Sequence, residues 1–174
     1  MKRVLFALAL MTASAAFAAD APTLTVTKSI DIKAPANVVW DLVKNFDGLN
    51  KWHPAVAKDQ ILEGKNNTVG AVRLLTLSDG GTIKEKLLAY DDAKHTMKYS
   101  ILEGVLPVSS YESTISVEGS TTASKVTWSG TFKRKDLSAT PAKDADDATA
   151  KTTMEAVYQA GLDNLVVRID RSRR

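Results

Sequence analysis

Hydrophobic and polar residues alternate along most of the chain between residues 24 and 134. Alternation at period two is typical of β-strands with one buried face. Turn sequences separate the alternating segments, among them Ser78-Asp-Gly-Gly81, which favours a tight hairpin. The pattern predicts seven antiparallel strands, at residues 24–32, 56–63, 70–77, 82–90, 95–102, 109–117 and 125–134.

Three other segments are predicted to form helices or, in one case, a helix or a turn. Pro35 opens the first of them, because its missing N–H costs nothing in a first turn. Apolar residues then recur every three or four positions up to Phe46, before a predicted stop at Gly48. A short helix or turn is predicted over residues 49–54, and a long amphipathic helix from about residue 146 to 169.

The long helix is the one predicted element large enough to cover an apolar sheet face. The predicted class is therefore α+β, with a bent seven-stranded antiparallel sheet wrapped around a C-terminal helix. Such a sheet leaves an elongated cavity suited to a small apolar ligand. Gly161 lies in the middle of the apolar helix face, where glycine costs about 1 kcal/mol relative to alanine. It either leaves room for a ligand or lets the helix approach the sheet closely.

The first 18 residues have the pattern of a cleaved signal peptide. Lys2 and Arg3 precede an apolar run over residues 4–16, and a small-x-small site ends at Ala18. The run is shorter than the roughly 20 residues of a membrane span. An uncleaved anchor is the alternative. We expect cleavage after Ala18, a periplasmic protein without a membrane span, one domain over residues 19–170 and a basic tail at 171–174.

The composition limits the kinds of functional site that the chain can form. The chain has no cysteine and two histidines, which excludes disulfides, thiolate nucleophiles, Cys-ligated zinc or iron–sulfur clusters and covalent haem attachment. We therefore expect no metal and no cofactor. Removal of the leader lowers the formal net charge from +3 to +1, because two positive charges and no negative ones leave with it. A nucleic-acid-binding protein is expected to be more basic.

A set of motifs in one order resembles the helix-grip fold of the START-like (SRPBCC) superfamily, in particular its polyketide cyclase/dehydrase branch. These motifs span about 100 residues, and the resemblance implies a sheet that grips the C-terminal helix around a hydrophobic cavity. The matching residues are Pro35, Trp40, Phe46-Asp47, Trp52-His53-Pro54, Val69-Gly70, Arg73, Asp79-Gly80, Glu85, Tyr90-Asp91, Tyr99, Leu106-Pro107-Val108, Tyr111 and Trp128.

Within that superfamily the chain is most similar to the MxaD type of periplasmic methanol-oxidation accessory protein. The resemblance implies a non-enzymatic protein that assists electron transfer from a methanol dehydrogenase to its cytochrome. Two alternatives stay open. One is a carrier of a small hydrophobic molecule, such as a lipid or a quinone-like compound. The other is a cyclase- or dehydratase-type enzyme that uses His53 and Glu85.

A more distant resemblance links the chain to the plant abscisic acid receptors. It implies that Glu85, Tyr111 and Ser113 are polar groups of a pocket. It also implies that residues 78–81 correspond to a gate loop, whereas Leu106-Pro107-Val108 at the latch position departs from the receptors. The lysine that would hold a ligand carboxylate falls near Ala57, which puts an acidic ligand in doubt.

Glu85 is the most informative candidate. Strand alternation places it on the inner face with Ile83, Leu87 and Ala89. An ionised carboxylate facing an apolar cavity needs a partner, and Arg73 on the preceding strand is the nearest one if the register allows. The pair either orients a ligand or is a structural ion pair.

His53 has two interpretations as well. It either acts as a general base tuned by Glu85 or packs at the pocket rim. Tyr99, Tyr111 and Trp128 share strand faces with apolar neighbours, so they belong to the core, and their polar tips can reach the cavity. The complete set of predicted cavity residues is Trp52, His53, Arg73, Glu85, Tyr99, Leu106, Tyr111, Ser113, Trp128 and Gly161.

Overall fold

The computed structural model describes residues 21–172; the predicted leader and the last two residues of the predicted tail lie outside them. In this part of the chain, seven strands, two α-helices and one 3₁₀ turn follow one another. Their bounds are β1 (Leu24–Ile32), α1 (Ala36–Val43), η1 (Leu49–Lys51), β2 (Val56–Glu63), β3 (Val72–Leu77), β4 (Thr82–Asp91), β5 (Thr96–Gly104), β6 (Val108–Gly119), β7 (Ser124–Arg134) and α2 (Asp147–Ser172).

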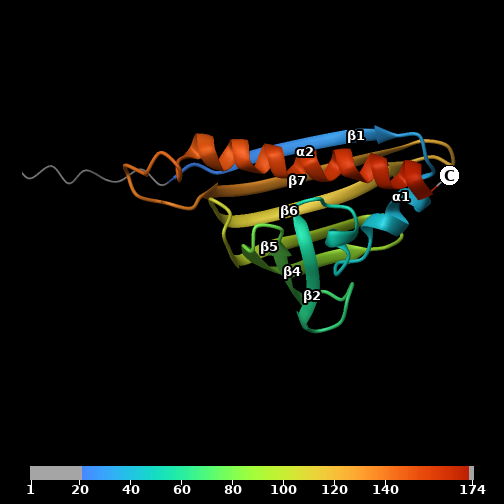
Figure 1. The fold of residues 1–174 in the computed structure, drawn as a ribbon, viewed down its shortest axis with the longest axis horizontal. Coiled ribbons are helices and arrows are strands. Elements are labelled where there is room, and N and C mark those ends of the chain that lie inside the picture. The colour runs from blue at the N-terminus through green and yellow to red at the C-terminus, as the bar shows by residue number, and fades with distance from the viewer. Residues whose placement is uncertain (1–20, 173–174) are drawn as a thin grey trace, which may run out of the picture.

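The strands form one antiparallel sheet in the order β1-β7-β6-β5-β4-β3-β2. β1 and β2 are the two edges, and α1 with η1 carries the chain from one edge to the other. α2 lies along β1 and β7 on one face of the bent sheet (Figure 1). This arrangement confirms the predicted α+β helix-grip architecture.

Alternating burial explains why these segments form strands. In β7 every second residue from Ser124 to Arg134 is buried, so one face of the strand is turned to the core. In β4 the alternation holds for Ile83, Glu85 and Leu87 but then fails. The pairing with β5 shifts between Leu87 and Ala89, which leaves Ala89 exposed instead of on the predicted inner face.

The first helix is shorter than its apolar spacing predicts. It ends at Val43 rather than near Phe46, although Phe46 is fully buried. The backbone N–H of Phe46 donates to the side chain of Asn67 at 2.9 Å, and that of Asp47 donates to Asn66 at 3.1 Å. Side chains of the β2–β3 turn thus take up backbone donors that a longer helix would use.

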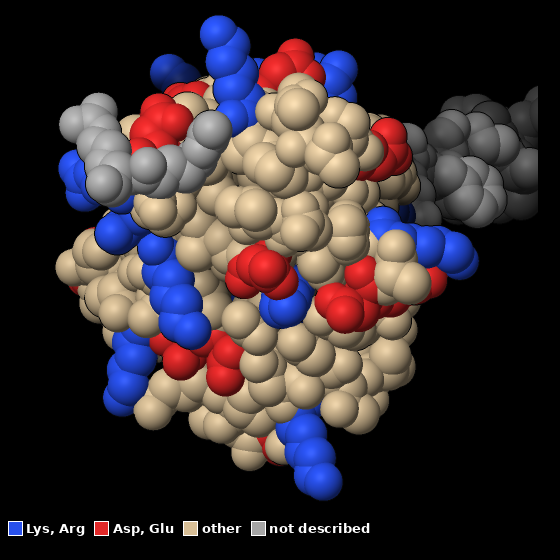
Figure 2. Space-filling model, turned by 90° about the vertical axis from the view of Figure 1, so that its right-hand side faces the viewer, with Lys and Arg blue, Asp and Glu red and all other residues tan. Residues whose placement is uncertain are grey.

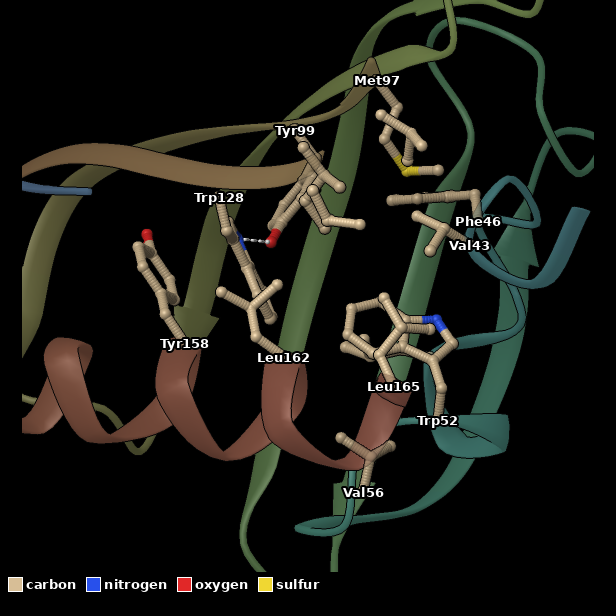
Figure 3. Close-up of a cluster of buried hydrophobic side chains, with 14 of the residues drawn as sticks. Val43, Phe46, Trp52, Val56, Met97, Tyr99, Trp128, Tyr158, Leu162 and Leu165 are labelled. Carbon is tan, nitrogen blue, oxygen red and sulfur yellow. Dashed lines mark hydrogen bonds between the residues drawn. The ribbon is translucent and has the colours of Figure 1, made fainter. Parts of the chain in front are cut away.

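α2 closes the core. Its buried residues recur at helical spacing from Ala150 to Ile169 and face the sheet, with Tyr158 and Leu162 at the middle (Figure 3). Asp146 caps the helix, because its Oδ1 accepts a hydrogen bond from the backbone N–H of Thr149 at 2.7 Å. Within residues 21–172, no helix is long and apolar enough to cross a membrane.

Candidate functional site

A small cavity lies between α2 and the sheet. Its volume is about 70 Å³, and its walls are mostly aliphatic, with contributions from β3, β4, β5, the segment around η1 and α2. For scale, an apolar cavity of about 150 Å³ takes up a benzene molecule. Six of the predicted cavity residues line it: His53, Glu85, Tyr99, Leu106, Tyr111 and Trp128.

The other four predicted residues lie outside this cavity. Trp52 and Arg73 border a much smaller space of about 10 Å³ beside α1. Ser113 is buried in the sheet, where its hydroxyl donates to the backbone carbonyl of Ser129 at 3.0 Å. Gly161 faces His53 rather than empty space.

Gly161 allows α2 to approach the sheet closely. A Cβ at this position would lie 2.7 Å from Cδ2 of His53 and 2.8 Å from Cζ3 of Trp128. Neither ring is the free end of a flexible chain, because both residues are buried. The glycine therefore makes room for these two rings, which is the second of the two interpretations given above.

Arg73 and Glu85 form a buried ion pair. They are directly opposite each other in the β3–β4 ladder, which puts both side chains on the inner face. Nε and Nη2 of Arg73 lie 2.7 and 2.6 Å from Oε2 of Glu85. Burial raises the pKa of Glu85, and the adjacent guanidinium opposes that rise. Both contacts use Oε2, so Oε1 is the oxygen that can accept a hydrogen bond from the cavity.

The rest of the guanidinium is also occupied. Nη1 of Arg73 donates to the backbone carbonyl of Phe46 and lies 3.3 Å from Oδ2 of Asp59. The guanidinium carbon is 4.3 Å from the centroid of the Phe46 ring. Arg73 therefore holds the segment after α1 against the sheet and is not available to a ligand carboxylate.

Asp59 is a member of this cluster that the sequence analysis missed. Its Oδ2 accepts the backbone N–H of Leu49 at 3.0 Å, whereas its buried Oδ1 has no partner within the described residues. Burial raises the pKa of Asp59 to about 6. The sequence gives only a weak signal that Asp59 faces inward. It lies two residues before Ile61, which packs against the core, and residues two apart in a strand share a face.

His53 uses both ring nitrogens. Nε2 donates to the backbone carbonyl of Val157 in α2 at 3.0 Å, and Nδ1 accepts the backbone N–H of Ala55 at 3.2 Å. This pattern fits a neutral imidazole protonated on Nε2. Burial lowers the pKa of His53, which also favours the neutral form. The histidine fastens the segment after η1 to the helix, and neither nitrogen is free to take a proton from a substrate.

A network of aromatic hydroxyls forms the polar part of the site. Nε1 of Trp128 lies 2.9 Å from both the Tyr99 hydroxyl and the Ser113 hydroxyl, and Figure 3 shows the first of these bonds. The hydroxyls of Tyr111 and Tyr158 are 2.6 Å apart. Tyr158, on the buried face of α2, thus joins the helix to the network. Burial raises the pKa of Tyr158 to about 12, so it is a neutral hydrogen-bonding group.

No group of three His, Cys, Asp or Glu side chains within the described residues could hold a metal ion. The arrangement offers an apolar space with one carboxylate oxygen and a few tyrosine hydroxyls at its wall. It can bind a small apolar molecule, or the apolar end of a larger one, and supply one or two hydrogen bonds.

Comparison with protein families gives one model that covers most of the chain. The family described as polyketide cyclase / dehydrase and lipid transport matches residues 23–170. Among curated proteins, an abscisic acid receptor of Arabidopsis thaliana (PYL10) is 34% identical over 93 residues, which cover 52% of this chain and 50% of the receptor. The chain thus spans about half the length of that receptor. An MLP-like protein of the same plant is 30% identical over 115 residues, 60% of this chain and 73% of the plant protein.

Solved structures agree with this assignment. The protein XoxI from Bacillus cereus is 31% identical, with a TM-score of 0.73 over 86% of this chain and 98% of XoxI. The ZhuI aromatase/cyclase of a Streptomyces species superposes with a TM-score of 0.69 over 88% of this chain and 97% of the enzyme, at 19% identity, and so shares the fold. The predicted resemblances to the cyclase/dehydrase branch and to the abscisic acid receptors are confirmed. The narrower resemblance to methanol-oxidation accessory proteins stays a prediction.

Proposed function

The chain belongs to the polyketide cyclase / dehydrase and lipid transport family, and from that premise we propose that it binds a small apolar molecule and does not transform it. The cavity between α2 and the sheet carries this proposal. Its walls are almost entirely aliphatic and aromatic, with few polar groups among them. Such a space favours burial of apolar surface with a small number of orienting hydrogen bonds.

Binding is favoured over catalysis by the state of the two candidate catalytic groups. A general base must reach the proton that it removes. His53 already has a partner on each nitrogen, and Glu85 is paired with Arg73. A cyclase or dehydratase mechanism would first have to break one of these contacts.

The chemistry of the wall also restricts the ligand. Arg73, the buried cation paired with Glu85 of the cavity wall, is neutralised by Glu85 and Asp59. A ligand carboxylate would therefore lose its hydration without gaining a counter-ion. We infer an uncharged ligand.

For the cellular role we propose a periplasmic accessory protein of methanol oxidation. The leader-like residues 1–18 and the similarity to MxaD-type proteins support this role. The protein would assist a dehydrogenase and its cytochrome by binding or orienting them, because the chain has no cysteine and the described residues offer no group of His, Cys, Asp or Glu side chains that could hold a metal ion. Co-purification with either partner is expected, and a pull-down from methanol-grown cells that recovers neither would contradict this role.

Native mass spectrometry of protein purified from its own cells tests the binding function directly. We expect a retained apolar molecule that is released by denaturation. A His53→Gln, Glu85→Gln double variant serves as the comparison for the enzyme alternative. If candidate substrates are turned over by the wild-type protein and not by the folded double variant, the protein is an enzyme and the proposal fails.

A further inference from the structure

The β5–β6 ladder stops halfway along the two strands. Pairing runs from Thr96 opposite Ser116 to Ser100 opposite Glu112 and ends there. Beyond that point β5 remains paired with β4 as far as Gly104, and β6 remains paired with β7. The sheet is therefore split between β5 and β6 at the end where the two strands are joined by residues 105–107.

A bulge lies on each side of this split. Leu102 is an extra residue of β5 relative to β4, and Ser110 with Tyr111 stands opposite the single residue Phe132 in β7. Ser110 also has a φ of +49°, which is uncommon for a residue other than glycine. Bulges bend a strand and are frequent beside functional sites. Here two of them lie in the strands that border the split.

A groove of about 320 Å³ occupies the split. Ile101 and Tyr111 belong both to the wall of this groove and to the wall of the inner cavity. Leu102, which is 51% exposed, lines the groove but not the inner cavity. The inner cavity and the groove are thus neighbouring spaces that share two wall residues.

We propose that the split is the entrance to the inner cavity and the second compartment of the ligand site. Its ligand is an amphipathic molecule whose apolar end passes Ile101 and Tyr111 into the cavity, while an uncharged polar head stays in the groove. This inference rests on the proposed binding function and adds the route and the ligand class.

The size of the inner cavity supports a ligand that extends outside it. At about 70 Å³ it has roughly half the volume that takes up benzene. A ligand of more than a few heavy atoms therefore needs further space. The groove supplies more than four times the volume of the inner cavity, next to its wall.

The chemistry of the groove supports the uncharged polar head. The unpaired strand edges carry backbone N–H and C=O groups, which offer both donors and acceptors. The charged side chains of the groove are Glu103 and Lys135, one of each sign. Nζ of Lys135 already donates to the carbonyl of Gly104 at 2.8 Å. A hydroxyl or amide head fits these surroundings better than a carboxylate.

Single cysteines can close the groove selectively, because the natural chain contains none. Leu62, Leu102 and Val105 have nearly equal exposures of 50%, 51% and 53%. Leu102 borders the groove, Val105 lies against Gly81 of the β3–β4 hairpin, and Leu62 is on β2. Each would be changed to Cys, modified with N-phenylmaleimide and titrated with 1-hexanol, 1-octanol and octanoate by calorimetry.

We expect wild-type protein to bind 1-octanol more tightly than 1-hexanol, by about fourfold for each added methylene that is buried. Modification at Leu102→Cys should weaken 1-octanol binding at least tenfold. The unmodified Leu102→Cys protein and the modified Leu62→Cys and Val105→Cys proteins should bind within about twofold of wild type. Octanoate should bind less tightly than 1-octanol.

Equal binding of 1-octanol by the modified Leu102→Cys and Leu62→Cys proteins would overturn the entrance while leaving the binding function intact. Weakening by modification at Val105→Cys alone would place the entrance at the β3–β4 hairpin instead. Tighter binding of octanoate than of 1-octanol would overturn the uncharged head. If wild-type protein binds neither alcohol, the proposed binding function itself fails, and this inference fails with it.

Discussion

At the scale of single residues, Gly161 shows how close packing outweighs local helix propensity. Replacement by alanine should gain about 1 kcal/mol of helix propensity. The added methyl group would lie within 2.8 Å of both His53 and Trp128, and overpacking of this kind costs about 1 to 3 kcal/mol. We expect Gly161→Ala to lower the free energy of unfolding in urea by about 1 kcal/mol.

The exposed face of the same helix provides the control. Ala156 is exposed on α2, so Ala156→Gly should cost about 1 kcal/mol through propensity alone. If Gly161→Ala instead stabilises the protein by a similar amount, the rings of His53 and Trp128 can move aside, and the close approach is not what this glycine provides.

As the pH falls, the contributions of Asp59 and His53 to the stability of the folded protein are expected to change in opposite directions. The pKa of His53 is lowered in the folded state, so its contribution to stability is lost as the pH falls below the unfolded value of 6.5. The pKa of Asp59 is about 6 in the folded state and 3.8 when unfolded. The folded protein therefore binds the Asp59 proton first and gains stability as the pH falls from about 7 towards 4.

This opposition predicts a difference for Asp59→Asn, which cannot take up that proton. Between pH 8 and pH 5 the variant should lose about 1 to 2 kcal/mol more of unfolding free energy than the wild type does. Urea unfolding at several pH values measures it, with Asp31→Asn, at a highly exposed position, as the control. Parallel pH profiles of wild type and Asp59→Asn would show that Asp59 is not protonated in this range.

Whether the sequence could predict these residues depended on how far apart their contact partners lie along the chain. Alternation within one strand was enough to predict Glu85 inside, and the tight hairpin made Arg73 the nearest candidate partner. The register that places Arg73 opposite Glu85 came from the structure. Asp59 lies on another strand and meets Arg73 through the segment around Leu49. Neither periodicity nor spacing carries information about such a three-segment contact.

At the scale of elements, two hydrogen bonds join the segment between α1 and β2 to α2. The His53 imidazole donates to the Val157 carbonyl, and Nδ2 of Asn164 donates to the Trp52 carbonyl at 2.8 Å. Asn164→Ala leaves the Trp52 carbonyl without that partner. We expect a loss of about 1 kcal/mol in the free energy of unfolding and faster amide exchange in residues 49–55.

Gln159 provides a matched control for this prediction. Its Nε2 donates to Oδ1 of Asp163 at the same distance of 2.8 Å, but both residues lie exposed on α2. Gln159→Ala should change the free energy of unfolding by less than about 0.5 kcal/mol. Equal effects of the two variants would mean that the bond to Trp52 does not hold the segment.

The elements themselves could be predicted because their signals are local. β1 and β2 have the predicted bounds, and the long helix starts within one residue of its prediction. The sequence did not predict the early end of α1, which Asn66 and Asn67 cause from a distant turn. It also did not predict the bulges that open the split between β5 and β6, since a bulge is defined by pairing between strands.

At the scale of the whole molecule, the charges suit a small-molecule site better than a polyanion site. Figure 2 shows lysine and arginine interspersed with aspartate and glutamate on one face, with both signs of charge also present near its centre. Loss of residues 1–18 would leave the chain nearly neutral, with a formal net charge of +1. Binding of nucleic acid rests on neutralising many phosphates, so salt-dependent retention on DNA is not expected.

The last prediction concerns the predicted leader, whose cleavage would place the protein in the compartment of the proposed ligand and partners. A positive start, a short apolar run and Ala16-Phe-Ala18 are expected to direct export and cleavage. The full-length chain should appear in the periplasmic fraction with a mass that corresponds to residues 19–174. A Leu5→Arg, Leu8→Arg variant, which interrupts the apolar run, should keep its leader and remain in the cytoplasm. Uncleaved wild-type protein in the membrane fraction would identify residues 1–18 as an anchor, and uncleaved protein in the cytoplasm would contradict the periplasmic role.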